Sequence, residues 1–129
     1  MDNTNLVESV IRDVKHCAVE VYNEVGRESY ENIYGACLEK EFGYQGIKYL
    51  AVASMPFFYK GDRINGLEIN PVWVVENTLL VKIDCFIDMK RNINEIVENQ
   101  IRFTGHNHAL LINFSTSGSS NLFTRVDLR

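Results

Sequence analysis

The sequence predicts an α/β protein in which helices flank a mixed β-sheet. Two observations lead to this fold class. Apolar residues recur at helical spacing over the first third of the chain, and apolar runs of strand length, separated by turn residues, follow it. One later segment with helical spacing interrupts the strands, so the expected order is α-α-β-β-β-α-β-β. The 129 residues suggest a single domain, 1–129, with one hydrophobic core.

Two helices are expected at the start of the chain. The first spans about Leu6–Glu24, with Asn5 as its N-terminal cap and Gly26 as the residue that breaks the pattern. The second spans about Ser29–Phe42, and we expect Gly43 to end it in a left-handed conformation. The expected apolar face of this second helix is formed by Tyr30, Ile33, Tyr34, Cys37, Leu38 and Phe42.

Strands are expected over most of the remaining chain. Residues Lys60–Asp62 indicate a turn, and Glu76–Asn77 indicates the tight turn of a hairpin. The strand Thr78–Phe86, which follows that turn, is apolar enough to be central in its sheet. We expect a third helix over about Ile93–Phe103 and a polar loop over Ser115–Ser120. The expected strands are Ile47–Ser54, Phe57–Lys60, Leu67–Val75, Thr78–Phe86, Ala109–Phe114 and Leu122–Val126.

Composition and charge narrow the function classes. Hydrophobic residues make up 46% of the chain and charged residues 23%, which is ordinary for a globular protein. No apolar run is long enough to span a membrane, and residues 1–5 lack the basic start of a secretory signal, so we expect a cytoplasmic protein. The formal charge of −4 disfavours indiscriminate binding to nucleic acid but allows a local basic patch. Three widely spaced cysteines without a CxxC pair are expected to be free thiols, mostly buried: Cys17, Cys37 and Cys85.

Several short motifs in a fixed order carry a family resemblance. Glu31 and Tyr34 lie three residues apart on the expected second helix, although a glycine of the same motif is replaced by Glu28. The later motifs are Phe58–Gly61, Thr104–Gly105, Leu110–Phe114 and Arg125–Val126. With this set the chain resembles the bacterial GxxExxY proteins, a branch of the PD-(D/E)xK nuclease-like superfamily, over about residues 10–126. The resemblance implies a restriction-endonuclease-like core and, as the ancestral activity, a magnesium-dependent nuclease.

The same alignment of motifs shows where this chain departs from the family. The metal-binding aspartate of the family falls at Pro71 or Val72. Its glutamate and lysine fall at Lys82 and Asp84, so the order of charge is reversed. Metal-dependent cleavage of phosphodiesters needs carboxylates around a hard cation. The departures therefore favour a degenerate, non-catalytic member, a pseudoenzyme without a cofactor that acts by binding or self-association. The candidate remnants of the site are Glu31, Tyr34, Lys82 and Asp84.

One alternative is a nuclease whose active site has moved. Lys82 and Asp84 lie two apart on one expected strand, so their side chains share a face. A site built from Glu31, Glu68 and Asp84 would then hold Mg²⁺ or Mn²⁺. The competing interpretation is that Lys82 and Asp84 form a neutralising pair, because buried charges need partners.

A second alternative is a structural homodimer. Exposed strand edges invite pairing with another chain. Either Ile47–Ser54 or Leu122–Val126 would supply the edge that pairs with a second copy. The sequence identifies no substrate and no other partner.

Overall fold

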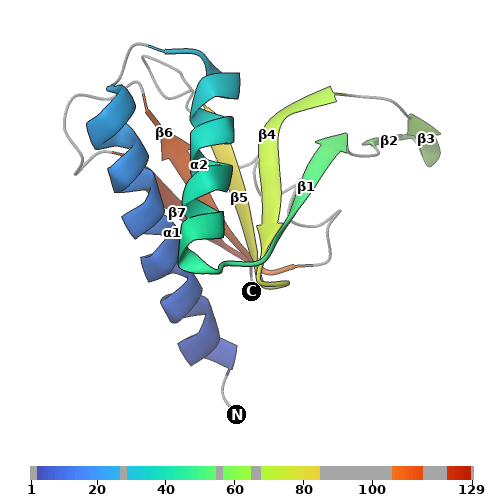
Figure 1. The fold of residues 1–129 in the computed structure, drawn as a ribbon. Coiled ribbons are helices and arrows are strands. Elements are labelled where there is room, and N and C mark those ends of the chain that lie inside the picture. Colours follow the sequence, from blue (N-terminus) through green and yellow to red (C-terminus); the bar gives the residue numbers. More distant parts are fainter. Residues whose placement is uncertain are drawn as a thin grey trace.

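The computed structural model describes residues 3–26, 29–54, 57–64, 68–84, 106–114 and 122–128. The expected third helix, the expected polar loop and Cys85 lie outside these residues. Within them the chain forms two helices and seven strands (Figure 1). The helices are α1 (Asn3–Val25) and α2 (Glu31–Gln45). The strands are β1 (Tyr49–Ser54), β2 (Phe57–Tyr59), β3 (Asp62–Ile64), β4 (Glu68–Val75), β5 (Leu79–Asp84), β6 (His108–Asn113) and β7 (Phe123–Asp127).

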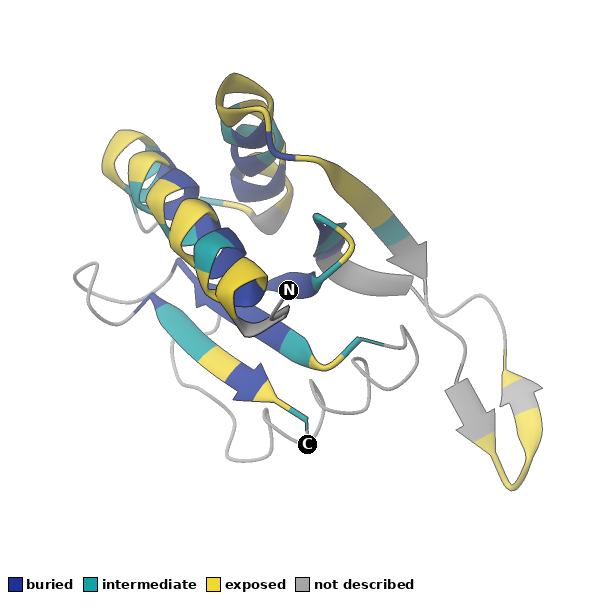
Figure 2. Ribbon diagram, turned by 90° about the horizontal axis from the view of Figure 1, so that it is seen from below, coloured by how far each residue is buried: buried dark blue, intermediate teal, exposed yellow. Residues whose placement is uncertain are grey.

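Five of these strands form one mixed sheet in the order β1-β4-β5-β6-β7. Strands β5 and β6 run parallel, whereas the other neighbouring pairs run antiparallel. Both helices cover the same face of the sheet, as Figures 1 and 2 show from two directions. The predicted α/β class with a mixed sheet is therefore confirmed. So is the prediction that the apolar strand after the Glu76–Asn77 turn is central, since β5 is the third of the five.

Apolar side chains are buried on both faces of the sheet. On the face covered by α1 and α2, alternate residues of β5 pack against the helices, namely Leu79, Val81 and Ile83. The apolar residues that recur at helical spacing along α1 form a stripe on this face, namely Val7, Val10, Ile11, Val14, Ala18 and Val21. Figure 2 shows the buried residues of α1 towards the sheet and its exposed residues away from it. The buried apolar residues of the opposite face are Val72, Leu80, Ala109, Leu111 and Val126.

The end of α2 differs from the sequence prediction. Gly43 lies inside the helix, and Gly46 is the residue in the left-handed conformation, with φ of 70°. The amide N–H of Gly46 donates to the Gly43 carbonyl, and that of Ile47 donates to the Phe42 carbonyl. This pair of hydrogen bonds satisfies carbonyls that the helix end leaves free. With the helix running to Gln45, both Phe42 and Ile47 are buried in the helix-covered core.

The structure also corrects the expected cap of α1 and the expected apolar face of α2. Asn5 is not the cap of α1, because the helix already begins at Asn3. Tyr30 and Ile33, expected on the apolar face of the second helix, are exposed. The buried stripe of α2 has a strict spacing of four residues, which leaves both of these side chains outside it: Tyr34, Leu38 and Phe42.

A two-stranded hairpin stands apart from the main sheet. The predicted turn at Lys60–Asp62 is confirmed, with positive φ at Lys60 and Gly61. The chain after it returns as β3, a strand that the sequence did not predict, and pairs only with β2. Figures 1 and 2 both show this hairpin, which we call the β2–β3 arm, projecting beyond the sheet.

Among the described residues, neither helix is at once long and apolar enough to cross a membrane. Cys17 and Cys37 are both free thiols, and Cys17 is fully buried where α1 meets the core. Burial raises the pKa of the Cys17 thiol to about 11, and the nearby carboxylates of Glu41 and Asp13 act in the same direction.

We predict that Cys17 resists alkylation in the native protein. Its thiol is protonated at neutral pH and shielded, and the thiolate is the reactive form. Mass spectrometry of iodoacetamide-treated protein should find Cys17 modified only after urea unfolding, while the half-buried Cys37 reacts sooner. Equal labelling of Cys17 with and without urea would contradict this packing of α1.

Candidate functional site

The candidate residue Lys82 lies on the central strand β5. Because Val81 and Ile83 belong to the helix-covered core, strand alternation directs the Lys82 side chain to the opposite face. Lys82 is nevertheless only 5% exposed. The sheet therefore buries a lysine on its face away from α1 and α2.

The strands beside β5 define the surroundings of Lys82. Its backbone pairs with Val72 on β4 and with Leu111 on β6. Residues paired directly across neighbouring strands point to the same face, and both Val72 and Leu111 are buried. The Lys82 side chain thus has buried aliphatic residues on both sides, and the buried Asn113 lies two residues after Leu111 on the same face.

For Asp84 and Glu68 the structure describes only the position of the backbone. Asp84 is the last residue of β5 and pairs with Asn113 of β6. Glu68 is the first residue of β4 and pairs with Ser54. The carboxyl groups of both residues lie outside the described atoms.

An irregularity in β4 affects the expected grouping of these residues. The pairing of β1 with β4 passes from Val52 with Val72 to Ser54 with Glu68. One residue of β1 therefore stands opposite residues 69–71 of β4, a bulge that contains Pro71. Regular alternation does not extend from Val72 to Glu68, so a site that includes both Glu68 and Asp84 stays a prediction.

Tyr34 is held on the other face of the sheet. Its ring stacks on that of Phe114, with centroids 4.3 Å apart and planes inclined by 6°. Its hydroxyl donates to the Gly26 carbonyl at 2.6 Å and accepts from the Ser29 amide N–H at 3.2 Å. Tyr34 therefore ties both ends of the α1–α2 connection to the core.

The sheet thus separates two of the predicted site residues. Phe114 packs in the helix-covered core, so the Tyr34 ring lies on that side, whereas Lys82 lies on the other. Glu31 begins α2 one turn before Tyr34. Its side chain is outside the described atoms, so its place in a site remains a prediction.

One polar contact at the edge of the helix-covered core was not predicted. The indole N–H of Trp73 donates to Oε2 of Glu39 at 2.7 Å and joins β4 to α2. No local sequence signal marks this pair, because 34 positions separate the two residues. The contact satisfies the polar atom of a buried tryptophan.

A charged cluster lines the outer strand β7. Arg125 contacts Glu8 of α1 at 2.7 Å and Asp127 at 3.0 Å. Nδ1 of His108 lies 2.6 Å from Oδ1 of Asp127. Burial raises the pKa of the Asp127 carboxyl, but hydrogen bonds from His108 and Arg125 outweigh it and hold that pKa below its ordinary value.

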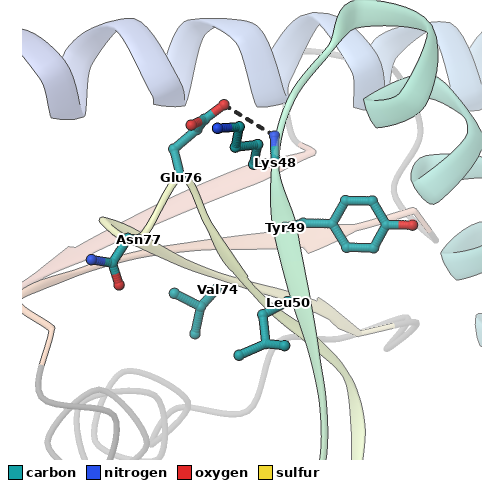
Figure 3. A pocket seen from close by; sticks show the side chains of 6 residues that line it. All are labelled: Lys48, Tyr49, Leu50, Val74, Glu76 and Asn77. Atoms are coloured by element: carbon teal, nitrogen blue, oxygen red, sulfur yellow. Dashed lines mark hydrogen bonds between the residues drawn. The ribbon is translucent and has the colours of Figure 1, made fainter.

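An open hollow lies at the other outer strand. It has a volume of about 260 Å³ and lies beside the β4–β5 turn (Figure 3). The backbone N–H of Lys48 donates to Oε2 of Glu76 across it, at 3.0 Å. We call it the β1 hollow, and its lining residues are Lys48, Tyr49, Leu50, Val74, Glu76 and Asn77.

Neither region has the ligand set of a metal centre. Over the part of the chain whose side chains are described, no three His, Cys, Asp or Glu residues gather closely enough to hold a metal ion. The carboxyl groups of Glu31, Glu68 and Asp84 lie outside that part of the chain.

Comparison with known families gives one match. A family model described as the PD-(D/E)XK nuclease superfamily matches residues 8–126. Two helices followed by a five-stranded mixed sheet agree with the restriction-endonuclease-like core that the resemblance implied. Comparisons with curated proteins and with solved structures found no match.

We predict that Tyr34→Phe lowers the free energy of unfolding by about 1–2 kcal/mol. The change keeps the stack on Phe114 but leaves the Gly26 carbonyl and the Ser29 amide without the hydroxyl. Urea denaturation measures the loss, and Tyr44→Phe, at an exposed tyrosine of the same helix, is the control. Equal effects of the two changes would contradict the role given to the Tyr34 hydroxyl.

We predict a pH-dependent contribution from Asp127. Its folded pKa lies below the ordinary value of 3.8, so ionised Asp127 stabilises the fold above that pH. The stability advantage of the wild type over Asp127→Asn should persist from neutral pH down to about pH 4 and vanish as the pH falls through the lowered pKa. Urea unfolding across this range checks the sign, and an advantage that grows in acid would contradict it.

Proposed function

Because the chain belongs to the PD-(D/E)XK nuclease superfamily, we propose that it is a non-catalytic member that acts by binding. We place it with the GxxExxY proteins on account of Glu31, Tyr34 and the later motifs. The observation that carries the proposal is the burial of Lys82 between Val72 and Leu111.

The residues at this point do not fit a catalytic cation. The resemblance assigns the metal-binding acids to the neighbourhood of Val72 and to Lys82. A valine supplies no oxygen ligand, and an ammonium group repels a divalent cation instead of coordinating it. Val72 and Lys82 therefore supply no ligand for Mg²⁺ or Mn²⁺, and we derive no cleavage step through such an ion.

The pairing of β5 keeps the Lys82 side chain on this face of the sheet. Hydrogen-bonded strands flank β5 on both sides, so moving the Lys82 side chain off its face would require a shift in register. A shift by one residue would turn Leu79, Val81 and Ile83 out of the helix-covered core. Lys82 therefore occupies the position at which the resemblance places a metal-binding acid, and the strand pairing fixes it there.

Exposed apolar side chains support a binding role. Several large apolar side chains are exposed near one edge of the sheet instead of being buried, namely Tyr44, Tyr49, Leu50, Tyr59 and Ile64. Large apolar side chains left exposed on consecutive elements of the chain are typical of contact surfaces.

We predict that the purified protein leaves single- and double-stranded DNA and RNA intact in the presence of Mg²⁺ or Mn²⁺. Glu31→Ala and Asp84→Ala should change nothing, because no cleavage depends on them. Gel analysis of labelled nucleic acids tests this, with an active magnesium-dependent nuclease in the same buffer as the positive control. Metal-dependent cleavage that either change abolishes would overturn the proposal and favour a relocated site built from Glu31, Glu68 and Asp84.

A further inference from the structure

The two outer strands of the main sheet differ sharply in chemistry. Strand β7 carries Arg125 and Asp127, both engaged in ion pairs. Strand β1 has six residues, none of them charged and none of them proline. Proteins usually protect exposed edges with charges or prolines, because an unprotected edge pairs with other strands. Of the two outer strands that the described residues form, β1 is the one without these protections.

The side chains of β1 agree with this interpretation. Leu50 is 68% exposed, and Tyr49 beside it is also exposed, although β4 covers the inner side of the strand. Tyr44, at the end of α2, adds another exposed ring. The regular part of β1 is Tyr49–Val52, because the bulge begins after Val52. This leaves a short apolar edge.

From these observations we propose that a second copy of this chain binds at β1, so that the two β1 strands pair antiparallel about a two-fold axis. The inference deepens the proposed binding function, on which it rests, by naming the partner. Two identical strands can pair antiparallel about a two-fold axis, because each copy then contributes the same surface to the interface.

The β2–β3 arm gives this pairing a second contact. The arm follows the C-terminal end of β1 in the chain. In an antiparallel pair, that end lies beside the N-terminal end of the other β1, where the β1 hollow is found. Each arm would therefore reach the hollow of the other copy.

The arm and the hollow are complementary. Tyr59 is 58% exposed on an arm of only two short strands, a structure that is marginally stable in water without a partner. The arm also exposes Lys60 and Asp62, and the hollow presents Glu76 and Lys48. In the proposed dimer, Lys60 would meet Glu76 of the other copy and Asp62 would meet its Lys48, with Tyr59 as the apolar contact between them.

We predict that sedimentation velocity finds a species of twice the 14.8 kDa of one chain as the concentration rises. Leu50→Lys, which places a charge on the edge, should give monomer at concentrations where the wild type is dimeric. Leu6→Lys is the matched control, because Leu6 is an exposed leucine on α1, and it should remain dimeric. Circular dichroism verifies that both variants are folded.

The arm is tested by charge reversal. Lys60→Glu alone and Glu76→Lys alone should each weaken the dimer at least several-fold, and the double variant should recover it, because each copy carries both changes. A double variant no stronger than the single ones would overturn the contact between arm and hollow.

The pairing itself is overturned if the wild type stays monomeric at the highest soluble concentration, or if Leu50→Lys dimerises as well as Leu6→Lys. A nuclease assay on the same samples separates the two proposals. Cleavage would overturn the non-catalytic function whatever the oligomeric state, whereas an inactive monomer would overturn only the dimer.

Discussion

The structure depends on a central strand that is buried on both faces and paired on both sides. Strand β5 hydrogen-bonds to β4 and β6, and its alternate residues enter two apolar layers. Such a strand has one permitted register, because a slip of one residue would exchange its two faces. Every side chain on it is consequently assigned to a face by its position alone. For Lys82 that assignment means burial between Val72 and Leu111, and the interpretation of the whole site follows from it.

The two faces of the sheet hold different residues among those that the family resemblance singled out. On the helix-covered face, Tyr34 joins the α1–α2 connection to Phe114, so this tyrosine has a structural task that does not depend on catalysis. On the other face, a lysine and a valine stand where the resemblance places acids. A fold can therefore retain its architecture while the chemistry of one face changes, since the core on the helix side does not involve Lys82. The exposed apolar edge at β1 then offers the chain a role that needs no reaction.

Much of the fold followed from patterns in the sequence, and the exceptions have physical causes. The α1 stripe and the central position of β5 were predictable, because period and apolarity are local properties. The end of α2 was not, because Gly43 and Gly46 are equally able to stop a helix, and the local sequence does not show that Phe42 and Ile47 both belong to the folded core. Strand β3 is too short and polar to give a signal. The alternation on β5 predicted that Lys82 and Asp84 share a face, but the sequence could not say which face the helices cover. Long-range contacts such as Tyr34 with Phe114 appear only when the chain is folded.

The central claim is that the face of β4 and β5 around Lys82 has lost its cation site. Nuclear magnetic resonance of ¹⁵N-labelled protein titrated with Mn²⁺ tests it most directly, because the paramagnetic ion broadens the amide signals nearest to it. The account predicts weak broadening scattered over exposed carboxylates, with the amides of Val72, Lys82 and Asp84 unaffected. Saturable broadening that begins at these three amides and is competed by Mg²⁺ would contradict it.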